Sequence, residues 1–267
     1  MIASGDHRSS VQELSNNTTM SSGDDPVQAL VDEMTNQGHP LRVLEAGAGS
    51  RSHIRLGANT QLVGIDICQE QLDNNHGLQE KILGDIQTYP LTPSSFDIIF
   101  CWDVLEHLKH PEHALDNFLG AIRPGGLMVM GAPAVNSVKG MITKYTPHWF
   151  HVFVYRHLLR NKNAGKPGHV PFPTFLRYSM SPRSLRSFAR EHGLVIEYFD
   201  EYEEKVQVRI KKKHWSINLA YVVIGPLVKV ASFGYINPEI TDFTIVLRKP
   251  ESKTLAPVAS KDLLQQV

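Results

Sequence analysis

The 267-residue chain has little cysteine, no excess of either charge and no long apolar run that is free of interruptions. Its two cysteines, Cys68 and Cys101, are too few for a disulfide framework, lack the spacing of a zinc site and fit a reducing compartment. Basic and acidic side chains both number 27, so no overall field indicates nucleic acid or an anionic partner. The N-terminus lacks a charged start followed by an apolar stretch, so we expect no secretory signal and a cytoplasmic location.

The two ends of the chain differ in composition from its middle. Residues 1–23 are rich in Ser, Asn, Thr and Gly and carry few large apolar side chains. A segment of that kind cannot bury enough apolar surface to offset its ordering entropy, so we expect it to be disordered. A folded domain is predicted over 24–250, opening with a helix that Asp24 or Asp25 caps. The tail over 251–267 is expected to be mobile.

Five short apolar segments alternate with predicted helices in the first half of the chain. The predicted strands cover 41–44, 62–67, 81–87, 96–101 and 127–133. Alternation of strands and helices predicts a parallel sheet with right-handed crossovers, which is a doubly wound α/β fold. Ligands of such folds bind beyond the carboxyl ends of the strands. The residues that follow each strand are therefore the first candidates for a site.

The first two strand ends carry glycines and a carboxylate. The first strand runs into E-A-G-A-G (45–49), where Gly47 and Gly49 permit a tight turn and let a ligand approach bare backbone. The second strand ends at Asp66. A carboxylate about 20 residues past a glycine turn is where doubly wound folds hold ribose hydroxyls. A ligand with an adenosine-like sugar is therefore expected.

The third and fourth strand ends carry further polar groups. Asp85 closes the third segment, and Cys101 and Trp102 close the fourth. The D-V-L-E run that begins at Asp103 has the spacing of a capping box. It predicts a helix that begins there and reaches an R-P-G-G turn at 123–126, ahead of the fifth strand.

The chain carries five motifs in the order of one known family: E-A-G-A-G (45–49), G-I-D (64–66), G-D-I (84–86), F-D-I-I-F-C-W-D-V-L-E-H-L (96–108) and I-R-P-G-G (122–126). They resemble a class I S-adenosylmethionine-dependent methyltransferase of the small-molecule type, similar to the branch that methylates quinones and many secondary metabolites. The resemblance implies a Rossmann-like seven-stranded sheet whose last strand is antiparallel, with the final pair over 194–203 and 242–249. It also implies S-adenosyl-L-methionine as cofactor and a small or lipid-like acceptor, most often methylated at oxygen.

The same resemblance implies where the cofactor would bind. Glu45 would order the glycine loop or hold the amino group of the methionine part, and Asp66 would accept hydrogen bonds from both ribose hydroxyls. The implied set is Glu45, Ala46, Gly47, Ala48, Gly49, Asp66, Ile67, Asp85, Ile86, Cys101 and Trp102. Asp85 and Ile86 would bracket the adenine, while Cys101 and Trp102 would meet the amino-acid end through backbone. Simpler interpretations are a strand-end cap for Asp66, a turn residue for Asp85 and a buried small hydrophobe for Cys101.

The chain departs from the family pattern at two places. Ser50 and Arg51 stand where a third glycine is common, and residues 50–61 leave little room for a crossover helix. A nicotinamide-dependent oxidoreductase is the alternative enzyme, although it would need glycine where Ser52 stands. A catalytically inactive scaffold that binds an adenosyl group is a third interpretation.

Methyl transfer from a sulfonium is an in-line displacement, so alignment of the reacting atoms can supply about 7–11 kcal/mol of catalysis. A general base helps only where the acceptor must lose a proton. His107 is the candidate base, because it follows the fourth strand and titrates near neutral pH. A packed helix histidine is the alternative. Glu106 is expected to cap the helix, and His110 and His113 are expected at the surface.

Residues 134–180 form an insertion that is dense in aromatic, His and Pro residues. In this topology it would lie over the carboxyl edge of the sheet as a lid and acceptor pocket. The candidate acceptor contacts are His148, Trp149, His151, Tyr155 and Tyr178. His148, His151 and His157 do not share one helical face and no carboxylate joins them, so no metal site is expected.

Residues 211–236 begin with three lysines and Trp215 and continue into an apolar stretch. Gly225, Pro226 and Lys229 interrupt that stretch, so it does not read as a membrane span. A buried helix pair between two strands is the favoured interpretation. The alternative is an interfacial anchor, which would give peripheral membrane contact and a lipid-like acceptor.

Overall fold

The computed structural model describes residues 25–36, 38–52, 56–57, 59–158, 161–166, 171–213 and 215–251. The predicted disordered segment 1–23 and all but the first residue of the predicted mobile tail 251–267 lie outside these residues.

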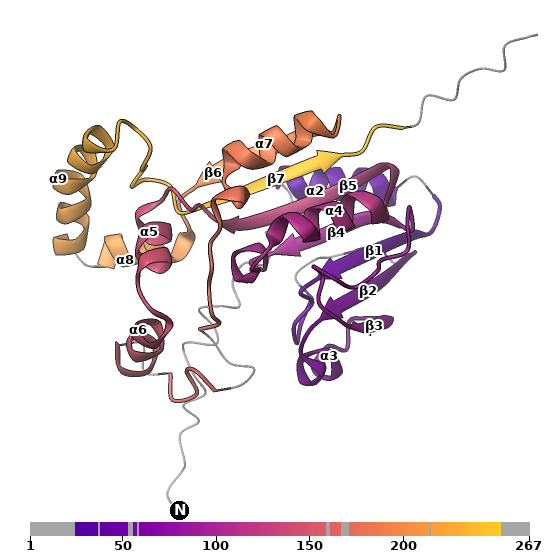
Figure 1. The fold of residues 1–267 in the computed structure, drawn as a ribbon, viewed down its shortest axis with the longest axis horizontal. Helices are drawn as coiled ribbons and strands as arrows, with labels where there is room; N and C mark the ends of the chain where they lie inside the picture. The colour runs from indigo at the N-terminus through magenta and orange to yellow at the C-terminus, as the bar shows by residue number, and fades with distance from the viewer. Residues whose placement is uncertain are drawn as a thin grey trace, which may run out of the picture.

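In the described part of the chain, seven strands form one sheet in the order β3-β2-β1-β4-β5-β7-β6 (Figure 1). The strands are β1 (Leu41–Ala46), β2 (Thr60–Asp66), β3 (Glu80–Leu83), β4 (Phe96–Trp102), β5 (Ile122–Pro133), β6 (Val195–Tyr202) and β7 (Asp242–Arg248). Strands β1 to β5 pair in parallel, and β7 is antiparallel to both β5 and β6. The predicted doubly wound sheet with an antiparallel last strand is confirmed.

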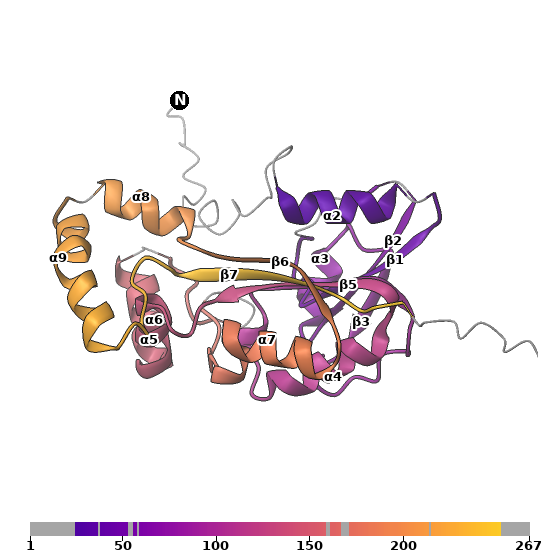
Figure 2. The same cartoon turned by 90° about the horizontal axis from the view of Figure 1, so that it is seen from above.

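Helices cover both faces of the sheet. The helices in the described residues are α2 (Pro26–Thr35), α3 (Gln69–Asn74), α4 (Pro111–Ala121), α5 (Val138–Tyr145), α6 (His148–Phe153), α7 (Pro182–Glu191), α8 (Lys205–Lys213) and α9 (Trp215–Ala231), with single turns η1 (Leu105–His107), η2 (Val154–Leu158) and η3 (Tyr178–Met180). Figure 2 shows α2 on one face and α4 and α7 on the other. Two helices start as predicted, because Asp25 Oδ1 accepts from the Val27 N–H at 2.9 Å and Ser181 Oγ accepts from the Ser184 N–H at 3.2 Å.

Two apolar layers follow from the alternation of side chains along the strands. On β1, Leu44 and Ala46 join the layer that contains Phe118 of α4, whereas Leu41 and Val43 join the layer under α2. The central strands are buried on both faces, which is why they are almost continuously apolar. Their carboxyl ends are held level by the register of the sheet, because Ala46 of β1 pairs with residues at the ends of both neighbouring strands.

The segment after β4 differs from the sequence prediction. Asp103 has a positive φ of 53°, and only the 3₁₀ turn η1 follows before α4 begins at Pro111. A residue before proline is disfavoured in the helical region, so His110 lies outside it, at φ −131° and ψ 69°. The prediction of one helix from Asp103 is therefore wrong. His107 lies on the 3₁₀ turn, and His110 is the residue that precedes α4.

The R-P-G-G segment also differs from its prediction as a turn ahead of the fifth strand, because it lies inside β5. The pairing with β4 shifts between Phe96 and Ile98, and Gly125 takes a φ of 81°. A positive φ at glycine accommodates the extra residues of a bulge, so the strand continues through a segment that reads as a turn.

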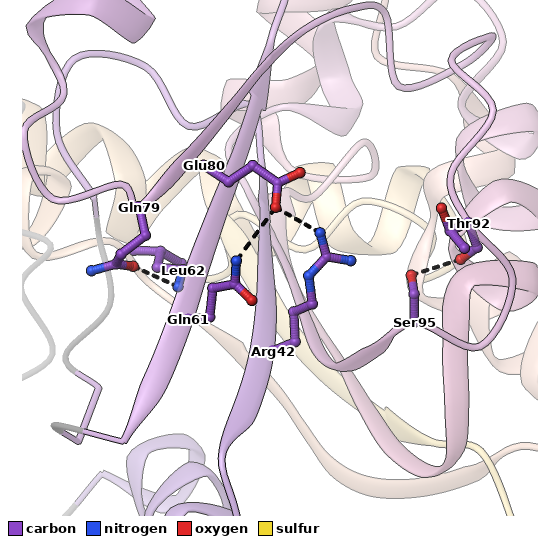
Figure 3. Close-up of polar contacts among 7 residues, drawn as sticks. All are labelled: Arg42, Gln61, Leu62, Gln79, Glu80, Thr92 and Ser95. Atoms are coloured by element: carbon purple, nitrogen blue, oxygen red, sulfur yellow. Dashed lines mark hydrogen bonds and ion pairs between the residues drawn. The ribbon is translucent and has the colours of Figure 1, made fainter.

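Polar side chains tie the strands together at their amino ends (Figure 3). Arg42 Nη2 lies 2.7 Å from Glu80 Oε2, which joins the starts of β1 and β3. The buried carboxylate of Asp97 accepts from the Arg42 N–H at 2.7 Å and from Arg123 Nη1 at 2.8 and 2.9 Å. A buried charge is stable only when it is paired in this way. The amino-terminal edge is therefore occupied by structural contacts.

The prediction that residues 211–236 form a buried helix pair is wrong about burial. The region does form two helices, α8 and α9, but the apolar side chains of α9 are largely exposed. Among the described residues, no helix combines the length and apolar character that crossing a membrane requires.

Candidate active site

The glycine loop after β1 is fixed by the end of β2. The N–H groups of Gly47 and Ala48 both donate to the carbonyl of Ile65, at 2.8 and 3.1 Å. Gly47 and Gly49 have positive φ angles of 73° and 52°. A Cβ on Gly47 would lie 2.3 Å from Cγ2 of Val104. Glycine is therefore required at 47 by both backbone conformation and space.

Asn75 also holds this loop, and sequence analysis missed it. The side chain is buried, and its Nδ2 donates to the carbonyls of Ala48 and Gly49 at 3.0 and 3.3 Å. The contact spans 27 residues, so no local pattern indicates it. A buried amide with several partners stabilises the shape of the loop before any ligand binds.

Asp66 has the position and the hydrogen-bonding capacity that a ribose diol needs. Its Oδ2 accepts from the Gly49 N–H at 3.0 Å, and its Oδ1 accepts from the Cys68 N–H at 2.9 Å. Each carboxylate oxygen can accept more than one hydrogen bond, so each retains capacity for one hydroxyl donor. Ile67 follows with 75% of its surface exposed, which offers an apolar surface beside the carboxylate.

Asp85 is engaged by its own turn. Its Oδ1 accepts from the backbone N–H of Gln87 at 2.9 Å, and the Gln87 side-chain Nε2 lies 3.0 Å from both carboxylate oxygens. Gln87 Oε1 in turn accepts from the His110 N–H at 2.9 Å. The turn-residue interpretation of Asp85 is thus satisfied, and Oδ2 has more acceptor capacity left than Oδ1. The side chain of Ile86 lies in the core, so only its backbone is available to an adenine.

Cys101 and Trp102 end β4 next to the glycine loop. Cys101 is buried, and burial raises the pKa of its thiol well above the usual value, so it stays a neutral small side chain. Trp102 lies against Gly131 of β5, where an added Cβ would be 2.7 Å from Cδ2 of the indole. Glu45, Ala46 and Ala48 are buried around the same loop. The small buried side chains of Cys101, Ala46 and Ala48 would leave mainly their backbone to contact an amino-acid group.

His107 is held in one orientation. Its Nδ1 lies 2.8 Å from the carbonyl oxygen of Pro173, and its ring meets the ring of Phe172 edge to face at 5.9 Å. Burial lowers the pKa of His107 below 6.5, while the Pro173 carbonyl and the charge of Asp103 oppose that shift. A carbonyl only accepts, so Nδ1 carries the proton of the neutral ring and Nε2 carries the lone pair. Nε2 lies 3.8 Å from Glu106 Oε1, beyond hydrogen-bond distance.

Residues 171–177, which we call the strap, place Phe172 and Pro173 against η1. The N–H groups of Phe175 and Leu176 both donate to the carbonyl of Glu106, at 2.8 and 3.0 Å. The carbonyl of Leu176 accepts from Lys144 Nζ at 2.7 Å, which ties the strap to α5. Glu106 is buried next to His107 and does not begin a helix, so its predicted role as a cap is wrong.

Two residues at the end of β6 and the start of β7 were missed. Tyr202 and Asp242 face each other in the register of the sheet, and Asp242 also pairs with Pro133 at the end of β5. Burial raises the pKa of Tyr202 to about 12, with contributions from Asp242 and Asp103, so its hydroxyl stays protonated. Tyr202 is thus a neutral phenol at the carboxyl edge, and its hydrogen bond with the Thr244 side chain opposes part of the rise in pKa.

The five candidate acceptor residues lie on three elements of the insertion. Tyr178 lies on η3, where its hydroxyl is 3.2 Å from that of Tyr145 and Lys144 Nζ lies 4.3 Å from its ring centre. The other four lie on α6 and η2, with His148 and Trp149 exposed and His151 Nε2 bonded to Thr146 Oγ1 at 2.7 Å. Among the described residues, no group of three His, Cys, Asp or Glu side chains is arranged to hold a metal ion.

Residues 44–130 match the family described as "Methyltransferase domain". A protein described as uncharacterised, of 37.1 kDa, in transposon TN4556 of Streptomyces fradiae is 36% identical over 84 residues, 29% of this chain and 24% of that protein. The ubiquinone biosynthesis O-methyltransferase of Colwellia psychrerythraea is 26% identical over 172 residues, 60% of this chain and 63% of that enzyme. The chain thus spans less than two thirds of the length of these relatives.

Among solved structures, phosphoethanolamine N-methyltransferase 2 of Haemonchus contortus, in complex with S-adenosyl-L-methionine, has a similar fold. The TM-score is 0.51 at 16% identity, over 88% of this chain and 55% of that chain. The sheet order with its antiparallel β7, and the glycine loop beside Asp66, define a Rossmann-like fold suited to an adenosyl ligand. Residues 44–130 thus match a methyltransferase domain, and the sheet has the order and the antiparallel β7 that the resemblance to class I S-adenosylmethionine-dependent methyltransferases implied.

Proposed function

We propose that the chain transfers a methyl group from S-adenosyl-L-methionine to a hydroxyl group of a small or lipid-like acceptor. The observation that carries this proposal is the geometry of His107, whose Nδ1 is held by the Pro173 carbonyl at 2.8 Å. This bond sets the tautomer and burial favours the neutral ring, so the lone pair lies on Nε2. Such a group is what an oxygen acceptor needs, because a hydroxyl must lose its proton as it is methylated.

The cofactor would be held by the residues at the ends of β1 and β2. Asp66 would accept from both ribose hydroxyls, and charge assistance makes such bonds about twice as strong as neutral ones. The backbone of the glycine loop would contact the sugar and methionine parts. When bound, the cofactor supplies a methyl group on a positively charged sulfur. The chain's own contribution is alignment, which needs few reactive side chains.

The carboxyl edge of the sheet carries negative charge that suits a cationic ligand. Asp103 acts electrostatically on His107, on Cys101 and on Tyr202, and so marks a negative field at the ends of β4 and β6. A sulfonium would be attracted by this field. Aromatic rings beside the edge, Phe172 among them, would add a cation–π contribution of about 0.5–2 kcal/mol.

The acceptor would lie beside η1 and the strap, within reach of His107 Nε2. Phe172 would form one wall, because its ring already meets the imidazole. Tyr178, which lies on η3, would also contact the acceptor. His148, Trp149, His151 and Tyr155 would contact the acceptor only when 134–180 closes over the edge as a lid, which we retain as part of the proposal.

The proposal is tested by two measurements on the full chain. Calorimetric titration with S-adenosylhomocysteine tests the cofactor site, and incubation with methyl-labelled donor and a panel of phenolic, carboxylic and lipid acceptors tests transfer. We expect binding and transfer to at least one hydroxyl acceptor. Binding without transfer to any acceptor would indicate the inactive scaffold, and the absence of binding would overturn the proposal.

The role of His107 needs a matched histidine as control. We expect His107→Gln to slow transfer to a hydroxyl acceptor by about 100-fold or more while leaving cofactor affinity unchanged. His113→Gln, at an exposed position of α4, should change neither quantity. Equal transfer rates in the two variants would remove His107 from the mechanism.

A further inference from the structure

The helices α8 and α9 concentrate positive charge in a chain that is neutral overall. Residues 205–238 contain six Lys and Arg side chains and no Asp or Glu, which leaves 21 basic and 27 acidic side chains elsewhere. The exposed members are Lys205, Arg209, Lys212, Lys213 and Lys229. Lys211 is engaged, because its Nζ lies 2.6 Å from Glu203 Oε1 and 4.1 Å from the ring centre of Tyr221.

The same segment exposes a row of large apolar side chains. On α9 the exposed members with helical spacing are Trp215, Leu219, Val222, Val223, Leu227 and Val230. Residues spaced by three, four and seven positions lie on one face of a helix. The opposite face meets the protein, because Tyr221 contacts Lys211 and Pro238 lies against Gly225. Phe233, which is fully exposed, follows in the turn after the helix.

We propose that the α8–α9 surface, residues 205–213 and 215–235, docks the protein on an anionic lipid bilayer. The apolar face of α9 would enter the interface between head groups and acyl chains, and the lysines beside it would meet the anionic head groups. A helix of 17 residues that contains Pro226 lies along such a surface; it does not cross it.

Two other occupants fit the surface less well. A second copy would bring two segments of net charge +6 together, and like charges oppose that contact. A nucleic acid would match the lysines but would leave Leu227, Val230 and Phe233 in water. Of these three occupants, the anionic bilayer is the one that matches both the positive charge and the apolar face.

The docking surface lies beyond the carboxyl edge of the sheet, the edge at which we place the site. Strand β6 runs in the same direction as β5, since both are antiparallel to β7, so α8 leaves the sheet at its carboxyl edge. Figures 1 and 2 both show α8 and α9 beyond that end of the sheet, together with α5 and α6. If the proposed function holds, docking presents the acceptor site to molecules dissolved in the membrane.

The experiment is co-sedimentation of the full chain with vesicles. One set contains phosphatidylcholine alone, and the other contains phosphatidylcholine with 30% phosphatidylserine. We expect binding to the anionic vesicles, weakened by salt, and a shift of tryptophan emission to shorter wavelength that Trp215→Phe removes. Lys212→Glu/Lys213→Glu and Leu227→Ser/Val230→Ser should each lower the affinity by about tenfold or more.

Matched controls replace exposed groups outside the surface. Arg183→Glu/Arg190→Glu on α7 makes the same change of charge, and Val195→Ser on β6 removes an exposed apolar group. Both should leave vesicle binding unchanged. All variants should bind S-adenosylhomocysteine as the parent chain does, so failure of docking is distinguishable from failure of the proposed function.

Several results would overturn the proposal. They are absence of binding to anionic vesicles, equal loss of binding in the α7 control, or a dimer in sedimentation velocity that Leu227→Ser/Val230→Ser dissociates. Tighter binding of single-stranded RNA than of the vesicles, lost in the lysine variant, would assign the surface to nucleic acid instead.

Discussion

The imidazole Nδ1 of His107 lies 2.8 Å from the carbonyl oxygen of Pro173, which follows it by 66 residues. One partner belongs to the turn after β4 and the other to the insertion after β5. The protonation state of the ring and the position of the strap are therefore linked. A change that moves the strap also releases the histidine from its tautomer.

Acidification should inactivate the enzyme below the ordinary range of a histidine. Burial lowers the pKa of His107 from 6.5, so the ring stays neutral, and able to accept a proton, through pH 7 and somewhat below 6.5. We expect kcat/KM for a hydroxyl acceptor to be constant above that range and to fall as the pH drops through the lowered pKa. In His107→Gln the residual activity should not show this fall in kcat/KM at low pH. If the fall persists in the variant, it belongs to another titrating group.

The lowered pKa of His107 also makes the free energy of unfolding depend on pH. The unfolded chain binds a proton at His107 near pH 6.5, but the folded chain binds it only at lower pH. The folded state is therefore favoured above pH 6.5 and loses this contribution as the pH falls through the folded pKa. Urea titrations at several pH values should show a smaller loss of unfolding free energy on acidification for His107→Gln, whose amide can still donate to Pro173. Identical slopes for both proteins would contradict this.

Asp66 and Asp85 should differ in their effect on the cofactor. Asp66→Ala removes the anchor of the Gly49 N–H and would remove the two proposed charge-assisted bonds to ribose, so we expect at least about a 100-fold weaker titration with S-adenosylhomocysteine. Asp85→Ala should weaken binding less, because Gln87 already satisfies much of that carboxylate. The reverse order would show that the adenine contact dominates over the ribose contact.

Gly47 and Val104 should be energetically coupled. Gly47→Ala places a Cβ 2.3 Å from Val104 Cγ2 at a positive φ, and we expect a loss of about 2–4 kcal/mol of unfolding free energy. Val104→Ala removes the overlapping methyl groups, so the double variant should recover part of that loss and retain the backbone strain. A double-mutant cycle by chemical denaturation measures the coupling, and additive effects would mean that the loop shifts away from Val104.

Asp97 should matter for stability and not for the site. Asp97→Ala leaves the Arg42 N–H and the Arg123 guanidinium without their buried acceptor, and we expect a loss of about 2–3 kcal/mol, or a melting temperature roughly 5–10 °C lower. Titration with S-adenosylhomocysteine at low temperature should be unchanged, because Asp97 lies at the amino end of its strand. A weaker affinity would show that the two edges of the sheet are coupled.

Much of the fold follows from local patterns. The central strands were predicted because burial on both faces demands near-continuous apolar sequence, and the starts of α2 and α7 were predicted because Asp25 and Ser181 cap a following proline. The helix after β4 was not, because Asp103 adopts a positive φ that its capping spacing does not reveal. The exposure of α9 was not predicted either, since apolar residues read alike in a core helix and in a surface helix.

The candidate site, like the fold, contains residues that local sequence patterns predicted and residues that they did not. Gly47 and Gly49 were predicted from the turn that follows the first strand, and Asp66 was predicted from its place at the end of the second strand, 17 residues past Gly49. Asn75 and the Pro173 carbonyl were not, because their partners lie 27 and 66 residues away and any amide or carbonyl could serve. Tyr202 was missed because its position depends on the pairing of β6 with β7.

The polar contacts of Arg42, Asp97 and Arg123 give the sheet one firmly held edge, while loops and insertions leave from the other. Amide hydrogen exchange should therefore be graded along each central strand, slowest near the guanidinium groups and fastest towards the glycine turn. Segments between strands could then be exchanged with those of a relative to redirect acceptor choice, with the scaffold beneath them left intact.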